Sequence, residues 1–260
     1  HRVLTFVLPI KGDQETFTTT LELVNTIGAK ERGTRRGNVA SLGSYARAAR
    51  VAVYDLGLSR TQFAMLAGGF ADTLGDNALV VPFSFEGLPS HVDHAQDTQG
   101  TQAWKLAILD DAIQRFGGML LWLEPYDAQQ RKVVIKRPLD RVREGLMRHG
   151  FVSPHTAGKI GERVHPAMLE RFGVQGDQQV LESANLDIHV VGIDAENATI
   201  MERVHKPLLQ CAYDLACIAP QGATKKSHQF TQSAMSVLVR KLGVQGLPVR
   251  KNDLHIDAIH

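Results

Sequence analysis

Short apolar runs that alternate with segments of helical period are the feature that most constrains the fold of this chain. Residues 2–10 form a nearly continuous apolar run that ends at a turn, as expected of a strand buried on both faces of a sheet. Residues 16–27 then place apolar side chains at helical spacing and stop at Gly28, which predicts a helix packed on one face of that sheet. The chain therefore opens as a strand followed by a covering helix.

The same alternation continues along the chain. It predicts further strands at residues 50–54, 78–85, 119–123, 133–136 (an edge strand) and 187–193. It predicts helices at residues 59–68, with Ser59 as the cap, and at 104–116, 139–148, 167–172, 198–214 and 231–242. Strands and helices in this order are typical of an α/β fold with a mainly parallel central sheet, helices on both faces and a ligand crevice beyond the carboxyl ends of the strands.

Charge and motifs exclude several classes of function. The chain has 29 basic and 27 acidic residues, so we expect no nucleic-acid partner. No run approaches the length of a membrane span, so we expect none in this sequence. The phosphate loops of ATPases and nicotinamide enzymes and the two commonest hydrolase signatures are absent. Four His and Asp side chains at residues 91–97 are expected to be solvated rather than to bind a metal.

The two cysteines, Cys211 and Cys217, have the wrong spacing for a zinc ribbon or a redox pair. A short disulfide and two buried thiols are both compatible with six residues of separation. The sequence begins at His1 and carries the sequon Asn197-Ala-Thr199, which is compatible with an excised domain of a secretory protein. We expect a location in the secretory pathway, in the Golgi lumen, with the cytoplasm as the alternative.

Six segments in order then carry a resemblance. They read Tyr-Asp-Leu-Gly-Leu-Ser from Tyr54, Pro-Phe-Ser-Phe from Pro82, Trp-Lys from Trp104, Leu-Trp-Leu-Glu-Pro from Leu121, the segment from Cys211 to Gly222 that contains Cys-Ile-Ala-Pro-Gln-Gly, and a His-x-x-x-Gln-Ser-Ala segment from His228. They resemble a little-characterised, largely eukaryotic family of glycosyltransferase-like proteins, over residues 50–245. The resemblance implies one domain over residues 1–260 with a nucleotide-diphospho-sugar transferase (GT-A type) fold, in which residues 1–125 bind the nucleotide and residues 126–260 form the acceptor side.

The resemblance also implies roles for individual residues. Asp55 would read the base of the donor, and the loop that contains Lys11 would lie beside the nucleoside. The groups expected to reach the donor diphosphate are Lys105 and His228. A divalent cation, Mn²⁺ or Mg²⁺, would be held by Glu124 with Asp127. The expected catalytic residues are Glu124, Asp187 and Gln232, of which Asp187 or Gln232 would work at the anomeric centre. His189 would line the acceptor site with Asp187.

Two departures from the family pattern leave alternatives open. Glu124 stands where the family has Asp, so a metal-independent site that uses Lys or Arg is the alternative to a cation. Thr231 with Gln232 replaces an Asp-Gln pair, which removes a carboxylate. The first hypothesis is an enzyme that moves a sugar from a nucleotide donor, expected to be a UDP-sugar, to a hydroxyl of a glycan or glycoprotein. The second is an inactive protein that binds a nucleotide or a glycan on the same fold.

Overall fold

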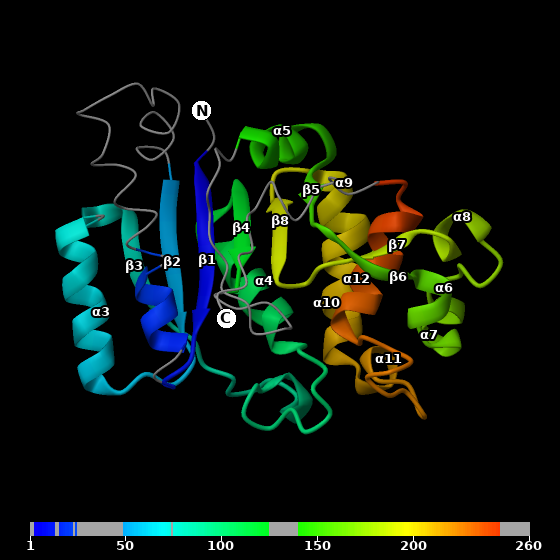
Figure 1. Ribbon diagram of the computed structural model, residues 1–260, viewed down its shortest axis with the longest axis horizontal. Helices are drawn as coiled ribbons and strands as arrows, with labels where there is room; N and C mark the ends of the chain where they lie inside the picture. The colour runs from blue at the N-terminus through cyan, green and yellow to red at the C-terminus, as the bar shows by residue number, and fades with distance from the viewer. Residues whose placement is uncertain are drawn as a thin grey trace.

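The computed structural model describes residues 3–13, 16–22, 24, 49–73, 75–124 and 140–244. Within these residues the central sheet has six strands, which Figure 1 shows side by side. In spatial order they are β3 (Ala78–Pro82), β2 (Ala49–Asp55), β1 (Leu4–Ile10), β4 (Met119–Leu123), β8 (Val190–Asp194) and β5 (Phe151–Val152). The first four are parallel to one another, whereas β8 runs antiparallel to both of its neighbours.

Both faces of the sheet are buried, because successive side chains of each strand enter different cores. In β1, Leu4, Phe6 and Leu8 belong to one core and Val7 to the other. The first core is completed by α3 (Arg60–Thr73), α5 (Asp140–His149) and the helical residues 16–22 and 24. The second is completed by α4 (Trp104–Phe116), α10 (Lys206–Tyr213) and α12 (Thr231–Lys241). The predicted α/β class, with a mainly parallel sheet and helices on both faces, is confirmed.

The start of α3 is determined by contacts between residues close in sequence. The Ser59 hydroxyl accepts a hydrogen bond from the Gln62 amide at 3.2 Å, and the Gln62 side chain accepts one from the Ser59 amide at 2.9 Å. This reciprocal arrangement satisfies two amides at the helix start, and Ser59 caps the helix as predicted. The predicted end at residue 68 is wrong, because Gly68 and Gly69 keep negative φ values and the helix continues to Thr73.

The second half adds a small two-stranded sheet and several short helices. The small sheet pairs β6 (His155–Lys159) with β7 (Ala184–Leu186). The short helices are α6 (Ile160–Arg163), α7 (Pro166–Arg171), α8 (Gln178–Leu181), α9 (Ala198–Ile200) and α11 (Leu215–Ile218). In the first half, the 3₁₀ turns η2 (Gly75–Asn77) and η3 (Ser90–Val92) precede β3 and α4. The spacing of apolar residues did not predict β6, β7 or α8, because segments this short contain too few residues to show a helical or strand periodicity.

Two predicted elements of the second half are corrected. The predicted strand at residues 187–193 begins only at residue 190, because the Asp187 carboxylate accepts the His189 amide and holds residues 187–189 in a turn. The predicted helix at residues 198–214 contains a π-helical stretch, η4 (Met201–His205), ahead of α10. Pro207 explains the break, since it has no N–H for the carbonyl four residues earlier.

Some predictions fall on residues that the structure does not describe. The predicted edge strand at residues 133–136 and the predicted metal ligand Asp127 lie outside the described residues. Across the described ranges, none of the helices has the length and apolar character that a membrane-crossing helix requires.

Candidate functional site

The carboxyl ends of β1, β2 and β4 meet at one edge of the sheet, because the three strands are parallel. Lys11 follows β1, Asp55 ends β2, and Glu124 follows β4. Strand β8 runs the opposite way, so the residues before it reach the same edge, where the Glu124 amide donates to the His189 carbonyl at 2.9 Å. This edge is where open α/β sheets bind their ligands.

A buried ion pair between Lys105 and Glu124 lies at the centre of this edge. Lys105 comes from the first turn of α4 and is only 2% exposed, and its ammonium contacts Glu124 Oε1. The Trp122 indole donates to the same oxygen at 3.3 Å. Burial lowers the pKa of Lys105, although the negative charge of Glu124 opposes this shift. The sequence-predicted residues Lys105 and Glu124 are therefore brought into direct contact with each other.

Asp187 and His189 form a second pair beside the first. Asp187 Oδ1 accepts from the His189 ring at Nδ1 (2.7 Å) and from the His189 amide (2.8 Å). Burial alone would raise the pKa of Asp187, but the hydrogen bonds from His189 leave it below its usual value. Because a carboxylate only accepts, Nδ1 carries the proton of the neutral ring, and Nε2 presents its lone pair. His189 Nε2 lies 3.9 Å from Glu124 Oε2.

Two hydrogen bonds with the preceding segment fix the main chain of the Asp187 turn. The Asp187 amide donates to the Pro154 carbonyl at 2.8 Å, and the Ser153 hydroxyl donates to the Asp187 carbonyl at 2.7 Å. Both contacts come from the segment that links β5 to β6. The Asp187 carboxylate is thus positioned by long-range contacts that local sequence does not reveal.

Aromatic rings line the edge from β2 to β4 in a continuous series. Successive ring centroids are 4.9 to 6.3 Å apart along Tyr54, Phe83, Phe85, His94, Trp104 and Trp122. The ammonium groups of Lys11 and Lys105 lie 5.5 and 5.6 Å from the Trp104 ring centroid, within the range of cation–π attraction. Lys11 is exposed, whereas Lys105 is buried. The sequence analysis did not propose Phe83, Phe85 or His94 as binding or catalytic residues, although Phe83 and Phe85 lie in one of the segments that carry the resemblance.

The loops after β1 and β2 are packed tightly against each other. A Cβ atom on Gly12 would lie 2.3 Å from the Gly57 carbonyl oxygen, so this contact requires glycine. Asp55 Oδ1 accepts from the amides of Gly57 (2.8 Å) and Leu58 (2.7 Å). Asp55 therefore shapes the turn after β2 through its own contacts with the main chain.

His228 does not present its ring to the crevice. It is fully buried, with Nδ1 accepting from the His165 amide (3.2 Å) and Nε2 donating to the Ile218 carbonyl (3.1 Å). Burial lowers its pKa to about 4, so the ring is neutral at physiological pH. The expectation that His228 reaches a donor diphosphate is not met in this structure, because both ring nitrogens are already bonded to the main chain.

Gln232 lies in the first turn of α12 and is 8% exposed. Its amide group donates to Thr156 Oγ1 at 3.1 Å and to Gln229 Oε1 at 2.8 Å. The neighbouring Thr231 hydroxyl donates to the Thr101 carbonyl, which joins the start of α12 to the loop before α4. Gln232 is thus held toward β6, whereas Lys105, Glu124, Asp187 and His189 contact one another directly.

The described residues contain no group of three or more His, Cys, Asp and Glu side chains arranged to hold a metal ion. Of the predicted pair of ligands, Asp127 lies outside those residues, and Glu124 has one oxygen against the Lys105 ammonium. A divalent cation at Glu124 would be repelled by this ammonium. The residues present therefore do not fit a cation at Glu124.

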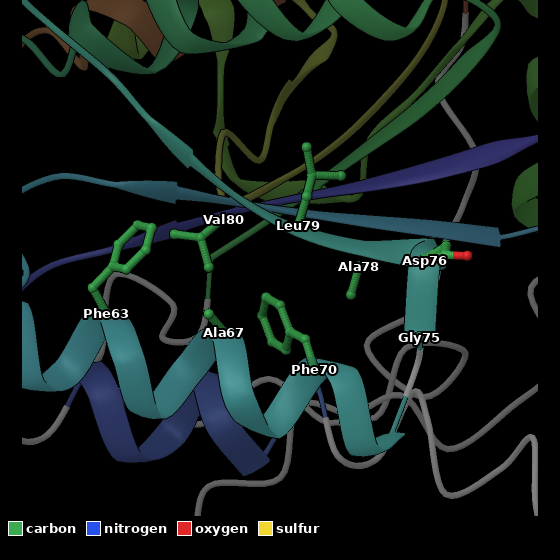
Figure 2. A pocket seen from close by; sticks show the side chains of 8 residues that line it. All are labelled: Phe63, Ala67, Phe70, Gly75, Asp76, Ala78, Leu79 and Val80. Atoms are coloured by element: carbon green, nitrogen blue, oxygen red, sulfur yellow. The ribbon is translucent and has the colours of Figure 1, made fainter.

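A separate pocket of about 430 Å³ lies between α3 and β3 (Figure 2). Its lining is mostly apolar and consists of Phe63, Ala67, Phe70, Gly75, Asp76, Ala78, Leu79 and Val80. Because Gly75 and Asp76 precede β3 and Ala78 begins it, the pocket lies toward the amino end of that strand. It is therefore away from the polar groups at the carboxyl edge.

No protein-family model matches this chain, and no curated protein is detectably similar in sequence. Solved structures do share its fold. Mouse xyloside xylosyltransferase 1 is 8% identical with a TM-score of 0.52, over 95% of this chain and 85% of that one. The bifunctional glycosyltransferase WbbM is 8% identical with a TM-score of 0.50, over 91% and 37%. The galactosyltransferase LgtC is 13% identical with a TM-score of 0.47, over 90% and 70%. The two structures with TM-scores of 0.52 and 0.50 show that the chain has the fold of the GT-A glycosyltransferases.

Proposed function

We propose that this protein transfers a sugar from a nucleotide-diphosphate donor, with a UDP-sugar as the expected donor, to a hydroxyl of a glycan or glycoprotein. One observation carries the proposal. Two largely buried pairs of ionisable side chains, Lys105 with Glu124 and Asp187 with His189, meet at the carboxyl edge of a sheet of this fold. Buried ionisable groups that gather in a crevice mark functional sites more often than structural ones.

The donor is proposed to lie across the ends of β1, β2 and α4. Lys11 is an exposed cation there, and its ammonium lies 5.5 Å from the centroid of the Trp104 ring, which is itself only 7% exposed. Asp55 shapes the adjoining turn through its bonds to Gly57 and Leu58, so its part in donor binding is to hold that loop. A nucleotide diphosphate would then place its negative charge near Lys11.

His189 is proposed to accept the proton of the attacking hydroxyl. The acceptor oxygen forms a bond to the anomeric carbon, the bond from that carbon to the diphosphate oxygen breaks, and the nucleoside diphosphate leaves. The proton moves from the hydroxyl to His189 Nε2 and later to water. Asp187 on the other ring nitrogen and Glu124 near Nε2 would stabilise the resulting imidazolium. A single displacement of this kind inverts the anomeric configuration.

The proposed division of the chain follows from where these groups originate. Lys11, Lys105 and Glu124 come from residues 1–125, proposed as the nucleotide half. Asp187 and His189 come from residues 126–260, proposed as the acceptor half of the same domain. Gln232 is a positioning residue in this proposal, since its amide group supports Thr156 and Gln229.

The test separates donor binding from transfer. UDP affinity is measured by calorimetry, and transfer is followed as UDP release from UDP-sugars offered with glycan acceptors. His189→Gln is expected to keep the UDP affinity within about threefold and to lower kcat by at least about 100-fold, the usual contribution of a general base. Asp187→Asn is expected to lower kcat less, because the ring of His189 remains but loses its orientation.

The exposed His149 at the end of α5 provides the matched control. His149→Gln should change neither UDP affinity nor kcat. If the wild-type protein binds UDP or a glycan but shows no turnover with any donor, the function is the second hypothesis, an inactive binding protein. If the protein binds none of the nucleotide sugars and glycans offered, both the enzyme hypothesis and the binding-protein hypothesis are wrong.

A disulfide between Cys211 and Cys217 supports the proposed location in an oxidising compartment such as the Golgi lumen. The bond closes the corner between α10 and α11. Mass spectrometry of the protein from its native source, unfolded and alkylated without reductant, should find neither cysteine alkylated. Two alkylated cysteines would favour the cytoplasm.

A further inference from the structure

The position of Lys105 bears on whether the site uses a cation at all. The resemblance to glycosyltransferase-like proteins implies that the acid after the fourth strand holds a divalent cation against the donor diphosphate. In this protein that acid is Glu124, and the Lys105 ammonium occupies the space against its Oε1. The following inference rests on the proposed function, because it concerns how the same site holds its donor.

Lys105 cannot simply turn away from Glu124 into solvent. It is 2% exposed, its stem lies in the first turn of α4, and its ammonium lies 5.6 Å from the Trp104 ring centroid. The partner carboxylate is fixed as well, by the Trp122 indole on Oε1 and by the main-chain bond from Glu124 to His189. The positive charge is therefore built into the wall of the crevice.

The charges of the site balance with this ammonium in place. The carboxylates of Glu124 and Asp187 bring two negative charges, and the ammoniums of Lys11 and Lys105 bring two positive ones. Lys11, on the exposed side of Trp104, remains available to a ligand.

We propose that the Lys105 ammonium takes the place of the divalent cation, so that this site binds a nucleoside diphosphate without a metal. The buried Lys105 ammonium neutralises the Glu124 carboxylate, and the exposed Lys11 ammonium contacts the diphosphate. Lys105 is thus a positioning and charge-balancing residue rather than a direct ligand of the donor. The departure from Asp to Glu at residue 124 suits this arrangement, because the longer side chain reaches the lysine of α4.

The first experiment needs no variant. UDP affinity of the wild-type protein is measured by calorimetry in EDTA and in Mn²⁺, and binding of Mn²⁺ alone is followed by electron paramagnetic resonance. We expect UDP affinities within about threefold of each other and no stoichiometric binding of Mn²⁺. Loss of UDP binding in EDTA, or one tightly bound Mn²⁺ per chain, would overturn the inference.

The second experiment removes the charge. Lys105→Met keeps the length and the apolar stem, and it leaves Glu124 and Asp187 without their buried cation. We expect this variant to lose at least tenfold in UDP affinity in EDTA, to regain part of it in Mn²⁺, and to bind Mn²⁺ alone. Lys105→Met with Glu124→Gln should lose the Mn²⁺ binding again, because the carboxylate is gone.

Lys159→Met is the matched control, since Lys159 is an exposed lysine that also pairs with a glutamate, Glu182. It should behave as wild type in every arm. A folded Lys105→Met variant that gains no Mn²⁺ affinity and keeps its UDP affinity would refute the inference. The Mn²⁺ arms need no donor, so they remain decisive even if UDP fails to bind and the proposed function itself is wrong.

Discussion

His228 shows how burial can reverse the role that a motif suggests for a residue. His228 belongs to the His-x-x-x-Gln-Ser-Ala segment, where a donor contact is expected. In the structure its buried ring instead forms hydrogen bonds with two main-chain groups. Its ring joins the His165 amide to the Ile218 carbonyl. The structure therefore predicts an effect on stability, with a definite pH dependence, instead of an effect on donor binding.

The prediction for His228 concerns the stability of the fold at acidic pH. Burial lowers the pKa of His228 in the folded protein to about 4 from the ordinary value of 6.5. Between these values the unfolded chain binds the proton and the folded chain does not, so stability is lost as the pH falls from 6.5 toward 4. The free energy of unfolding should decrease by about 2 kcal/mol between pH 7 and pH 5 through this residue.

Urea unfolding at the two pH values measures this loss. His228→Gln, which keeps an amide that can reach the Ile218 carbonyl, should lose about 2 kcal/mol less than wild type on acidification. His149→Gln should show the full acid loss. Equal losses in wild type and His228→Gln would show that the ring is protonated in the fold.

Gly12 carries the second prediction at this scale. Gly12→Ala would place a Cβ atom 2.3 Å from the Gly57 carbonyl oxygen, so the loops after β1 and β2 must move apart. We expect a loss of about 1–3 kcal/mol in unfolding free energy and weaker UDP binding, because both loops border the proposed donor site. Gly176→Ala, which meets no atom within 4 Å, is the control, and similar behaviour of the two variants would contradict the prediction.

At the scale of elements, the corner between α10 and α11 depends on the disulfide. Cys211 lies in α10 and Cys217 in α11, with Cα atoms 5.2 Å apart, and both are buried. The Asp214 carboxylate between them caps α11 by accepting from the Ala216 amide at 3.0 Å. The cap and the disulfide together fix the direction in which the chain leaves toward the segment that contains His228.

Replacement of both cysteines by serine should lower stability by about 2 kcal/mol, since the bond closes a loop of only six residues of separation. Transfer activity and UDP affinity should remain, because neither sulfur contacts the charged pairs. Thermal unfolding with and without reductant measures the first effect, and calorimetry the second. If the double variant folds but no longer binds UDP, the corner between α10 and α11 contributes to the donor site, and the prediction is wrong.

At the scale of the whole molecule, the proposed site joins both halves of the chain. Lys105 and Glu124 belong to the first half and Asp187 and His189 to the second, and β4 and β8 pair directly beneath them. A ligand at this edge contacts groups that only the complete sheet brings together. Donor binding should therefore stabilise the fold as one unit.

UDP at about 100 times its dissociation constant is expected to stabilise the fold by about 2.7 kcal/mol. Thermal unfolding should remain a single transition that shifts upward with UDP, with or without EDTA. Adenosine diphosphate serves as the control for base recognition and should shift the transition less. Two transitions, of which UDP raises only one, would show that the halves unfold separately.

The amino-acid sequence by itself determined the alternation of strands and helices, the α/β class and the cap at Ser59. These depend on apolar periodicity and on contacts within a few residues, so they can be read locally. The resemblance to glycosyltransferase-like proteins, and not the periodicity, suggested Lys11, Asp55, Lys105 and Glu124 as site residues, and their roles remain predictions.

Only the tertiary structure decided how those residues are partnered. Lys105 and Glu124 are separated by most of α4 and by β4, and His189 meets Glu124 through the antiparallel β8. His228 contacts the His165 amide, 63 residues away in sequence. The choice between a disulfide and two thiols at Cys211 and Cys217 was likewise settled by the fold of the α10–α11 corner. Charge and hydrogen-bond partners depend on which distant segments share a buried space, and a linear pattern of residues does not contain that information.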